Sequence, residues 1–271
     1  MSAALSRAGE IVATHVTKVF RDINRGEEIV ALQDFSLTVR PNTFVAILGP
    51  SGCGKSTFLN IVAGFEQPSL GSVTLNGIRI TEPGPDRGVV FQDYALFPWL
   101  TVKQNIEFGM RYQPLTALQR ASVVEELIQL IHLQRFEHRY PRELSGGMKQ
   151  RVAIARVLAT NPKILVMDEP FASLDALTRH AMQKQLLEVW QKRQATVLFV
   201  THSVEEAIFL ADEIVTVSAR PGRILDIQKV ADERPRNPVS ENFNRIRKIL
   251  MELLENEVNT ATQQAETNFA T

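Results

Sequence analysis

The chain has 271 residues, of which thirty are lysine or arginine and thirty are aspartate or glutamate, so its zero net charge argues against a nucleic-acid-binding protein. The single cysteine excludes an intrachain disulfide and a site of several thiolates, and it fits a reducing compartment. The length and a hydrophobic fraction of 44% predict one large or two modest globular domains.

The apolar segments of the chain are short. The first residues, MSAALSRAGE, contain no stretch of signal-peptide length, and no later segment has the roughly 18 uncharged apolar residues that a membrane span needs. We therefore expect neither export nor a membrane span. Residues 44–49, 163–168 and 196–200 are the most apolar runs, and turn or helix signals follow them. Such runs predict strands that are buried on both faces, as in parallel sheets.

Residues 10 to about 75 predict mainly strands. β-Branched residues alternate in IVATHV and SVTL, and Asn76-Gly77 is typical of a hairpin turn. One helix, after Gly54, interrupts this region. We expect an antiparallel β portion near the N-terminus.

From residue 101 to about residue 159 the pattern predicts helices. Thr101 with Gln104, and Thr116 with Gln119, each match a capping box. A further helix is expected over 147–159. The helix after Thr116 has an apolar face formed by Val124, Leu127, Ile128 and Ile131.

Strands and helices alternate in the next part of the chain. A buried strand ends at Asp168, a helix follows from about 175 to 193, and then comes the strand 196–200. Ser203 with Glu206 matches a third capping box. The alternation predicts a mostly parallel sheet covered by helices, with a helical lobe inserted from about residue 92 to residue 160.

The last predicted helix covers about residues 241–255 and has one apolar stripe, which could face the core or a partner. Residues 256–271 lack periodicity and are predicted to be a disordered tail. The stripe consists of Phe243, Ile246, Leu250 and Leu253.

Residues 49–57, GPSGCGKST, match the phosphate-binding pattern G-x-x-x-x-G-K-[ST] between a predicted strand and a predicted helix. The glycines let backbone N–H groups point inward, and the helix adds its positive end. Lys55 would reach the β- and γ-phosphates of a nucleotide, and Ser56 would ligate Mg²⁺. A simple glycine-rich turn is the alternative. The residues predicted to bind the nucleotide here are Gly49, Ser51, Gly52, Cys53, Gly54, Lys55, Ser56 and Thr57.

Two carboxylates follow the buried strand that precedes them, at the edge where parallel sheets bind ligands. Asp168 would hold Mg²⁺ through water, and Glu169 could orient or deprotonate the water that attacks the γ-phosphate. Without the phosphate loop, an acidic pair that caps a helix would be an equal alternative.

Residues 144–159, LSGGMKQRVAIARVLA, place Ser145, Gly146 and Gly147 before a helix, which gives the chain a second anion-binding helix N-terminus. An ordinary capped helix is the alternative. The stretch resembles the signature LSGGxxQR of the ATP-binding subunits of ABC transporters, and the match comprises Leu144, Ser145, Gly146, Gly147, Gln150 and Arg151.

This resemblance covers nearly all of residues 11–254. It implies a head-to-tail dimer in which Ser145 and Gly147 of one subunit close over the ATP that Lys55 of the other subunit holds.

The resemblance also extends to four single positions. Phe20 falls where the family has an aromatic ring that stacks on adenine, with a core phenylalanine as an equal alternative. Gln92 matches the glutamine that contacts Mg²⁺ or its water. His202 matches the switch histidine that hydrogen-bonds the γ-phosphate, with a core histidine as the alternative. Asp175 matches the loop that crosses the dimer interface.

Cys53 lies inside the phosphate loop, where many relatives have serine. We expect the following helix N-terminus to lower the pKa of its thiol. For turnover itself, a passive small residue is the preferred interpretation.

The fold implied by the resemblance is α/β. A P-loop ATPase core with a mostly parallel sheet and the antiparallel β portion would comprise residues 1–91 and 161–225. Residues 92–160 would form the inserted helical lobe with the signature, residues 226–255 a C-terminal extension, and residues 256–271 the tail.

The implied activity is hydrolysis of ATP, with Mg²⁺, by the motor subunit of a bacterial importer. The implied partners are a second ATP-binding subunit, transmembrane permease subunits and an extracytoplasmic substrate-binding protein, and no nucleic acid. The chain would lie peripherally at the cytoplasmic face of the inner membrane.

Two other function classes compete with this interpretation. A soluble ATPase of the same superfamily, acting in DNA repair or translation, would usually need long coiled coils or a second cassette, and the sequence has neither. A small-molecule kinase would share the phosphate loop but would leave LSGGMKQR unexplained.

Residues 91–106 are unusually rich in large apolar side chains, and Pro98 breaks them. We expect them to dock a cytoplasmic helix of a membrane subunit, with packing inside the helical lobe as the alternative. Within seven residues the segment contains Tyr94, Leu96, Phe97, Trp99 and Leu100.

Two segments, FPWLTV at 97–102 and SARPGRI at 218–224, resemble the nitrate, sulfonate and taurine branch of bacterial importers, which also includes some bicarbonate importers. This resemblance implies uptake of a small oxyanion or an organosulfonate, with nitrate and alkanesulfonate as equal candidates.

Overall fold

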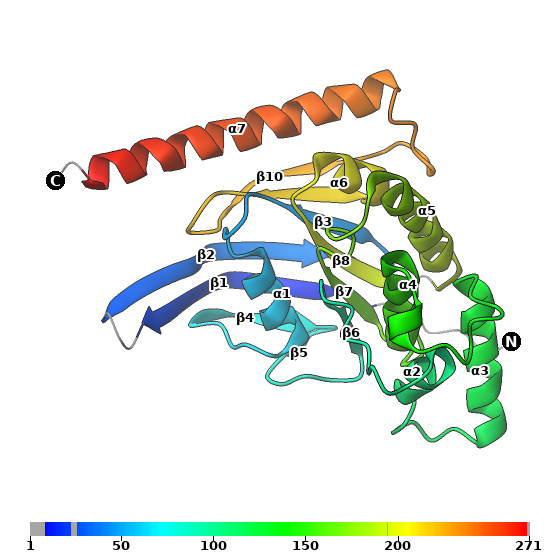
Figure 1. Cartoon of the computed structure of the whole chain (residues 1–271). Coiled ribbons are helices and arrows are strands. Elements are labelled where there is room, and N and C mark those ends of the chain that lie inside the picture. Colours follow the sequence, from blue (N-terminus) through cyan, green and yellow to red (C-terminus); the bar gives the residue numbers. More distant parts are fainter. Residues whose placement is uncertain (1–8, 23–25, 194, 270–271) are drawn as a thin grey trace, which may run out of the picture. The chain divides into compact units, whose positions relative to one another are not determined.

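The computed structural model describes residues 9–22, 26–193 and 195–269 (Figure 1). Residues 1–8, where no signal sequence is expected, and residues 270–271 of the predicted tail lie outside the described residues. No helix within the described part combines the length and the apolarity that crossing a bilayer requires.

The described residues form two compact units. Unit 1 comprises residues 84–195, and unit 2 comprises residues 9–83 and 196–269. The phosphate loop therefore belongs to unit 2, and the LSGGMKQR segment belongs to unit 1.

An antiparallel sheet in the order β2-β1-β4-β5 lies in unit 2. Ile11 pairs with Val39 on one side and with Leu75 on the other, so β1 is hydrogen-bonded along both edges. Asn76 and Gly77 turn the chain with φ of 51° and 77°, the left-handed values of a two-residue hairpin. The predicted antiparallel portion is confirmed. Its strands are β1 (Ile11–Asp22), β2 (Glu27–Val39), β4 (Leu70–Leu75) and β5 (Ile78–Arg79).

A second group of strands in unit 2 is mainly parallel. β3 (Phe44–Leu48) pairs in parallel with β8 (Thr196–Thr201) and with β9 (Glu213–Val217), and β10 (Ile224–Lys229) pairs with β9 in the antiparallel sense. Every residue of β3, β8 and β9 is buried, which confirms what the short apolar runs predict.

Unit 1 contains β6 (Arg87–Val90) paired in parallel with β7 (Ile164–Asp168). Its first two helices begin at the predicted capping boxes: the hydroxyls of Thr101 and Thr116 accept N–H groups three residues on, and both glutamine side chains bond back. The helices are α2 (Val102–Phe108), α3 (Ala117–Leu130), α4 (Gly146–Leu158) and α5 (Ala176–Arg193), with a 3-10 turn at Pro141–Glu143.

The helical part of unit 1 has its own core, because α2 packs on both α3 and α4. The predicted apolar face of α3 is buried, each side chain being at most 5% exposed. The residues that form this core include Val102, Ile106, Val124, Leu127, Ile128, Ile131 and Val152.

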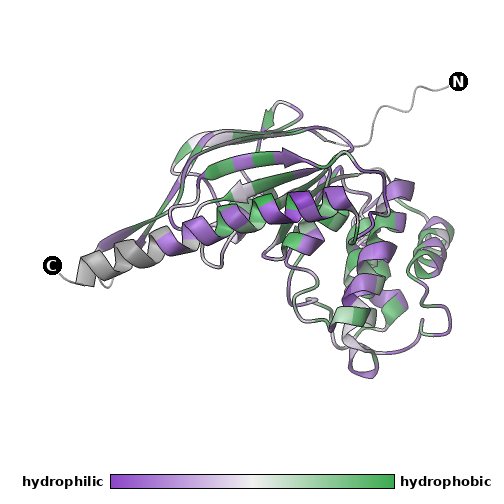
Figure 2. Cartoon of the chain, turned by 90° about the horizontal axis from the view of Figure 1, so that it is seen from above, coloured by the Kyte–Doolittle hydropathy of each residue, from purple (hydrophilic) through white to green (hydrophobic). Residues whose placement is uncertain are grey.

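Three helices belong to unit 2: in chain order they are α1 (Lys55–Ala63), α6 (Val204–Leu210) and α7 (Glu241–Phe269) within the described residues. Phe243, Ile246 and Leu250 are buried and Leu253 is half-buried, so the predicted apolar stripe of α7 faces the core of unit 2 at its first three positions. Hydrophilic and hydrophobic residues alternate along the coloured part of α7 in Figure 2. The helix continues past the predicted end near Glu255, because no glycine or proline follows to stop it.

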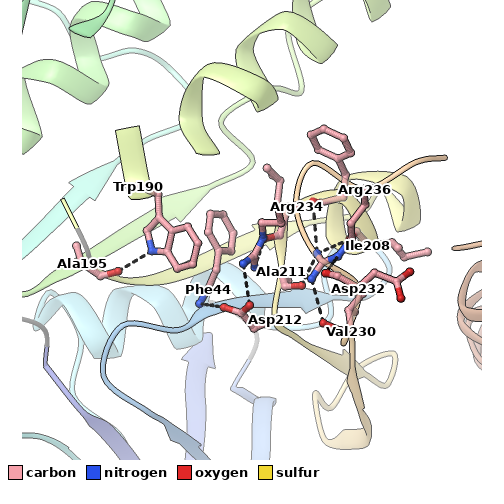
Figure 3. Close-up of polar contacts among 12 residues, drawn as sticks. Phe44, Trp190, Ala195, Ile208, Ala211, Asp212, Val230, Asp232, Arg234 and Arg236 are labelled. Carbon is pink, nitrogen blue, oxygen red and sulfur yellow. Dashed lines mark hydrogen bonds and ion pairs between the residues drawn. The ribbon is translucent and has the colours of Figure 1, made fainter. Parts of the chain in front are cut away.

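A buried arginine ties the segment before α7 to the end of α6 (Figure 3). The guanidinium of Arg236, 4% exposed, donates to backbone carbonyls that would otherwise lack partners at the C-terminus of α6. Burial, with the nearby Arg234 as a second cause, lowers the pKa of Arg236 to about 10, so it remains a cation at neutral pH. Its carbonyl partners are Ile208, Phe209, Ala211, Val230 and Asp232.

Candidate nucleotide-binding site

The phosphate loop joins the buried strand β3 to α1. Gly52 and Gly54 have φ of 78° and 98°, values that favour glycine. A Cβ at Gly54 would also lie 2.6 Å from the carbonyl oxygen of Ala31, so a side chain does not fit there. The loop therefore needs glycine at both positions, and its backbone can form the anion-binding concavity that the motif predicts.

Lys55 is the cation of this loop, and it is only 6% exposed. Its Nζ donates to the carbonyl oxygens of Gly49 and Pro50, both at 2.7 Å. Within the described part of the chain, no carboxylate forms an ion pair with Lys55. A buried cation that only neutral groups contact is suited to an anionic ligand, and phosphate oxygens meet that need.

Cys53 differs from its sequence prediction. The side chain is 1% exposed, and burial raises the pKa of its thiol, while the neighbouring ammonium of Lys55 acts in the lowering direction without offsetting it. The prediction of a lowered pKa is wrong, because loss of solvation of the thiolate outweighs the charge and the hydrogen bonds of Lys55.

His202 directly follows β8, and it is exposed, which rules out the alternative of a core histidine. The turn around it is held by two hydrogen bonds: Thr201 Oγ1 donates to Glu206 Oε2 at 2.7 Å and accepts the N–H of Ser203 at 3.0 Å. Ser203 Oγ accepts the N–H of Glu206, so it caps α6 as predicted. The reciprocal half of the third capping box is wrong, because the Glu206 carboxylate bonds to Thr201 instead.

Phe20 lies on β1 and is 38% exposed, so the alternative of a core phenylalanine is wrong. The ammonium of Lys18 lies 4.9 Å from the centre of its ring. An exposed aromatic face beside a cation can stack on a planar base, and this role for Phe20 stays a prediction.

Asp168 and Glu169 leave the end of β7 in unit 1. Glu169 has φ of 42°, a left-handed value that costs free energy for a residue with a side chain. A helix N-cap has extended dihedral angles instead, and α5 begins only at Ala176. The alternative of a helix-capping acidic pair is therefore wrong.

The signature segment also shows why it needs small residues. Ser145 Oγ accepts the N–H of Met148 at 3.3 Å and caps α4. A Cβ at Gly147 would lie 2.7 Å from the side chain of Thr178, and one at Gly146 would lie 3.0 Å from the hydroxyl of Tyr94. Close packing against these neighbouring side chains therefore favours glycine at both positions.

Three further residues belong to unit 1. Gln92 follows β6 and is exposed, so it can reach a ligand. Asp175 accepts the N–H of Thr178 at 3.0 Å, and this hydrogen bond lowers the pKa of its carboxyl group. Gln150 of the signature is fully buried, and neither atom of its side-chain amide has a hydrogen-bond partner within the described structure.

The predicted residues divide between the two units. Unit 2 contains Phe20, residues 49–57 and His202. Unit 1 contains Gln92, Ser145, Gly146, Gly147, Asp168, Glu169 and Asp175.

Sequence reasoning did not find the loop 218–223, between β9 and β10, as a neighbour of the phosphate loop. A Cβ at Gly222 would lie 2.2 Å from the carbonyl oxygen of Cys53. The dipeptide Pro221-Gly222 does signal a turn, but sequence alone does not say what the turn contacts.

Residues 32–172 match the family model described as ABC transporter. The chain belongs to this family. It is therefore an ATP-binding protein whose hydrolysis of ATP is coupled to transport. The family membership and the α/β ATPase fold implied by the resemblance are confirmed.

Individual relatives and a solved structure support the same family assignment. The chain is 48% identical to an uncharacterized ABC transporter ATP-binding protein of Methanocaldococcus jannaschii, over 90% of this chain and 91% of the relative. It is 45% identical to a nitrate import ATP-binding protein of Synechocystis (83% and 85% covered) and 43% identical to an aliphatic sulfonates import ATP-binding protein of Bacillus subtilis (83% and 87% covered). The ATP-binding cassette MJ0796, solved as a post-hydrolysis dimer with ADP and Pi, superposes with a TM-score of 0.71 at 32% identity, covering 82% of this chain and all of that one.

Proposed function

We propose that this chain energises uptake of a small anion, nitrate or an alkanesulfonate such as taurine, by hydrolysing ATP at the cytoplasmic face of the membrane. For ATP use, the supporting observation is the buried Lys55 ammonium beside a glycine-dependent phosphate loop, which among the described residues contacts only neutral groups. For the cargo, the support is the similarity to nitrate and sulfonate import proteins.

The proposed roles follow from residue chemistry. Residues 49–57 hold the phosphates, with Lys55 at the β- and γ-phosphates, and Phe20 stacks on the adenine. The hydroxyl of Ser56, the amide of Gln92 and the carboxylate of Asp168 are oxygen donors of the kind that suits Mg²⁺. That ion, when bound, would neutralise charge on the phosphates.

Glu169 and His202 carry the proposed proton and charge chemistry. Glu169 orients the attacking water and takes its proton, which requires a carboxylate close to the metal site but not bound to the metal. His202 donates a hydrogen bond to the γ-phosphate, which its exposure at the end of β8 permits.

A second ATP-binding subunit is part of the proposal, because the chain has two separate helix N-termini suited to anions, at α1 and at α4. In a head-to-tail dimer, Ser145, Gly146 and Gly147 of one subunit contact the nucleotide of the other, and Asp175 lies at the dimer interface. The solved relative MJ0796 is itself described as a dimer.

A permease helix is the proposed occupant of a groove of about 570 Å³ in unit 1. The rings of Phe97 and Phe108 lie 4.4 Å apart along it, and the guanidinium of Arg156 lies 5.4 Å from the ring of Phe97. Tyr112 at its edge is 91% exposed, and the neighbouring Trp99 is 69% exposed. Such a concentration of exposed aromatic rings is typical of a protein-binding surface.

Replacing Trp99 or Tyr112 with alanine should weaken assembly with the permease subunits by about tenfold or more, because exposed aromatic rings often dominate an interface. Co-purification and coupled transport measure this loss, and the melting temperature of the isolated subunit should stay unchanged. Leu118→Ala is the matched control, since Leu118 is 82% exposed on α3 and does not line the groove. A loss of stability in the Trp99 variant would instead support packing inside the helical lobe.

The cargo is tested by uptake into vesicles that hold the complete complex, including its permease and extracytoplasmic substrate-binding protein, with ATP inside. We expect ATP-dependent uptake of labelled nitrate, taurine or another alkanesulfonate, and loss of uptake with Lys55→Ala. Transport of a sugar or an amino acid, with none of the three anions taken up, would contradict the proposed cargo and leave the ATPase assignment intact.

A further inference from the structure

The loop 218–223, between β9 and β10, is closed on itself by hydrogen bonds. The N–H of Ser218 donates to the carbonyl of Arg223, and the N–H of Arg223 donates to Ser218 Oγ, both at 2.9 Å. Ser218 Oγ in turn donates to the carbonyl of Pro221 at 2.8 Å. These three hydrogen bonds hold the two ends of the loop together.

One side of this loop lies against the phosphate loop. Nε and Nη2 of Arg220 are each 3.4 Å from the carbonyl oxygen of Gly52. The lack of space for a Cβ at Gly222, 2.2 Å from the carbonyl oxygen of Cys53, shows how closely the two backbones approach. The N–H of Gly222 also donates to the carbonyl of Ala31 at 2.9 Å, which fixes the loop to β2.

The other side of the loop is held by α7. An oxygen of the Glu257 carboxylate accepts the N–H of Ala219 at 3.1 Å. The helix itself is anchored at its start, where Phe243, Ile246 and Leu250 are buried. Glu257 of α7 therefore holds the backbone of Ala219, the residue directly before Arg220, and Arg220 contacts the phosphate loop.

The contact falls on the outward side of the phosphate loop. In such a loop the N–H groups converge on the anion, so the carbonyl groups of the same peptides need other partners. A guanidinium on the carbonyl of Gly52 satisfies that oxygen and polarises the peptide towards stronger donation by the N–H of Cys53. It also adds a positive charge beside the site of a polyanion.

We propose that Arg220 is a positioning residue for nucleotide binding, and that Glu257 of α7 holds Arg220 in place through the backbone of Ala219. This inference rests on the proposed role of the phosphate loop. It makes the C-terminal helix a determinant of affinity for ATP.

The test uses the full chain with substitutions at both ends of the contact. Arg220→Ala and Glu257→Ala should each raise the KM for ATP and weaken binding of a fluorescent ATP analogue by about three- to tenfold, with kcat nearly unchanged. Arg220→Lys should restore part of the affinity. Glu257→Gln should restore most of it, since an amide oxygen can still accept the N–H of Ala219.

Two matched control variants test whether the effect depends on these particular contacts or only on the loss of a charge. Arg223→Ala removes a cation from the same loop, one that hydrogen-bonds Gln33 rather than the phosphate loop. Glu252→Ala removes an exposed carboxylate of α7 whose partner is Lys248. Both variants should bind the analogue like the unaltered chain, and a loss in either equal to that in Arg220→Ala would overturn the positioning role.

The chain supplies a readout that needs no nucleotide, because Cys53 is its only thiol. Its burial and raised pKa predict slow reaction with a maleimide. Loss of the Arg220 or Glu257 contact should loosen the phosphate loop and speed labelling severalfold. Unchanged labelling and unchanged affinity in both alanine variants would refute the inference, whereas failure of the unaltered chain to bind the analogue would refute the nucleotide site itself.

Discussion

Glu169→Gln should lower the rate of ATP hydrolysis by about 10²-fold or more while ATP binding persists, and a nucleotide-bound dimer should accumulate. The amide keeps the shape of the carboxylate but cannot take a proton from water. The left-handed φ of 42° at Glu169 indicates a residue held at a functional position rather than one that caps a helix.

Phosphate release, binding of an ATP analogue and light scattering measure the three parts of this result. Glu188→Gln is the control, because Glu188 is an exposed carboxylate on α5 of the same unit. Near-normal turnover in Glu169→Gln would show that another group activates the water.

Ser145→Arg should abolish ATP-driven dimerisation, even in combination with Glu169→Gln. A long cation would project from the N-terminus of α4, where Ser145 is exposed. In the proposed dimer this position faces the partner's nucleotide, so the added side chain would prevent closure. Light scattering with ATP should report a monomer.

Ser145→Arg also removes the N-cap of α4, which is an effect separate from the added bulk. The Ser145 hydroxyl accepts the N–H of Met148, and removing an N-cap costs roughly 0.5–2 kcal/mol of stability. Ser145→Ala loses the same cap without adding bulk and should still dimerise. Dimer formation by the arginine variant would contradict a nucleotide shared between subunits.

Much of the local structure could be predicted because its causes lie within a few residues of one another. The capping boxes at Thr101 and Thr116, the turn at Asn76-Gly77 and the glycine-dependent phosphate loop all formed as predicted. Each depends on side-chain and backbone chemistry inside one short segment.

The features that the sequence did not predict have a different origin, because each depends on burial or on a contact between residues distant in the sequence. Burial of Cys53, which raises its pKa, comes from the packed surroundings of the phosphate loop and not from the helix that follows it. Glu206 bonds to Thr201 because both are enclosed at the end of β8. The contact between Arg220 and Gly52 joins residues 168 positions apart, which no local pattern encodes.

The hydrogen bonds from Arg236 to backbone carbonyls limit how far the chain can be truncated from its C-terminal end. Ending it before this residue would remove a cation that satisfies the last carbonyls of α6, and it would also remove the side chains of α7 that cover the core of unit 2. Helix α6, which follows His202, therefore depends on a segment with no sequence motif of its own. A shortened chain that keeps unit 2 stable should therefore extend at least to Leu250, the last of these buried side chains.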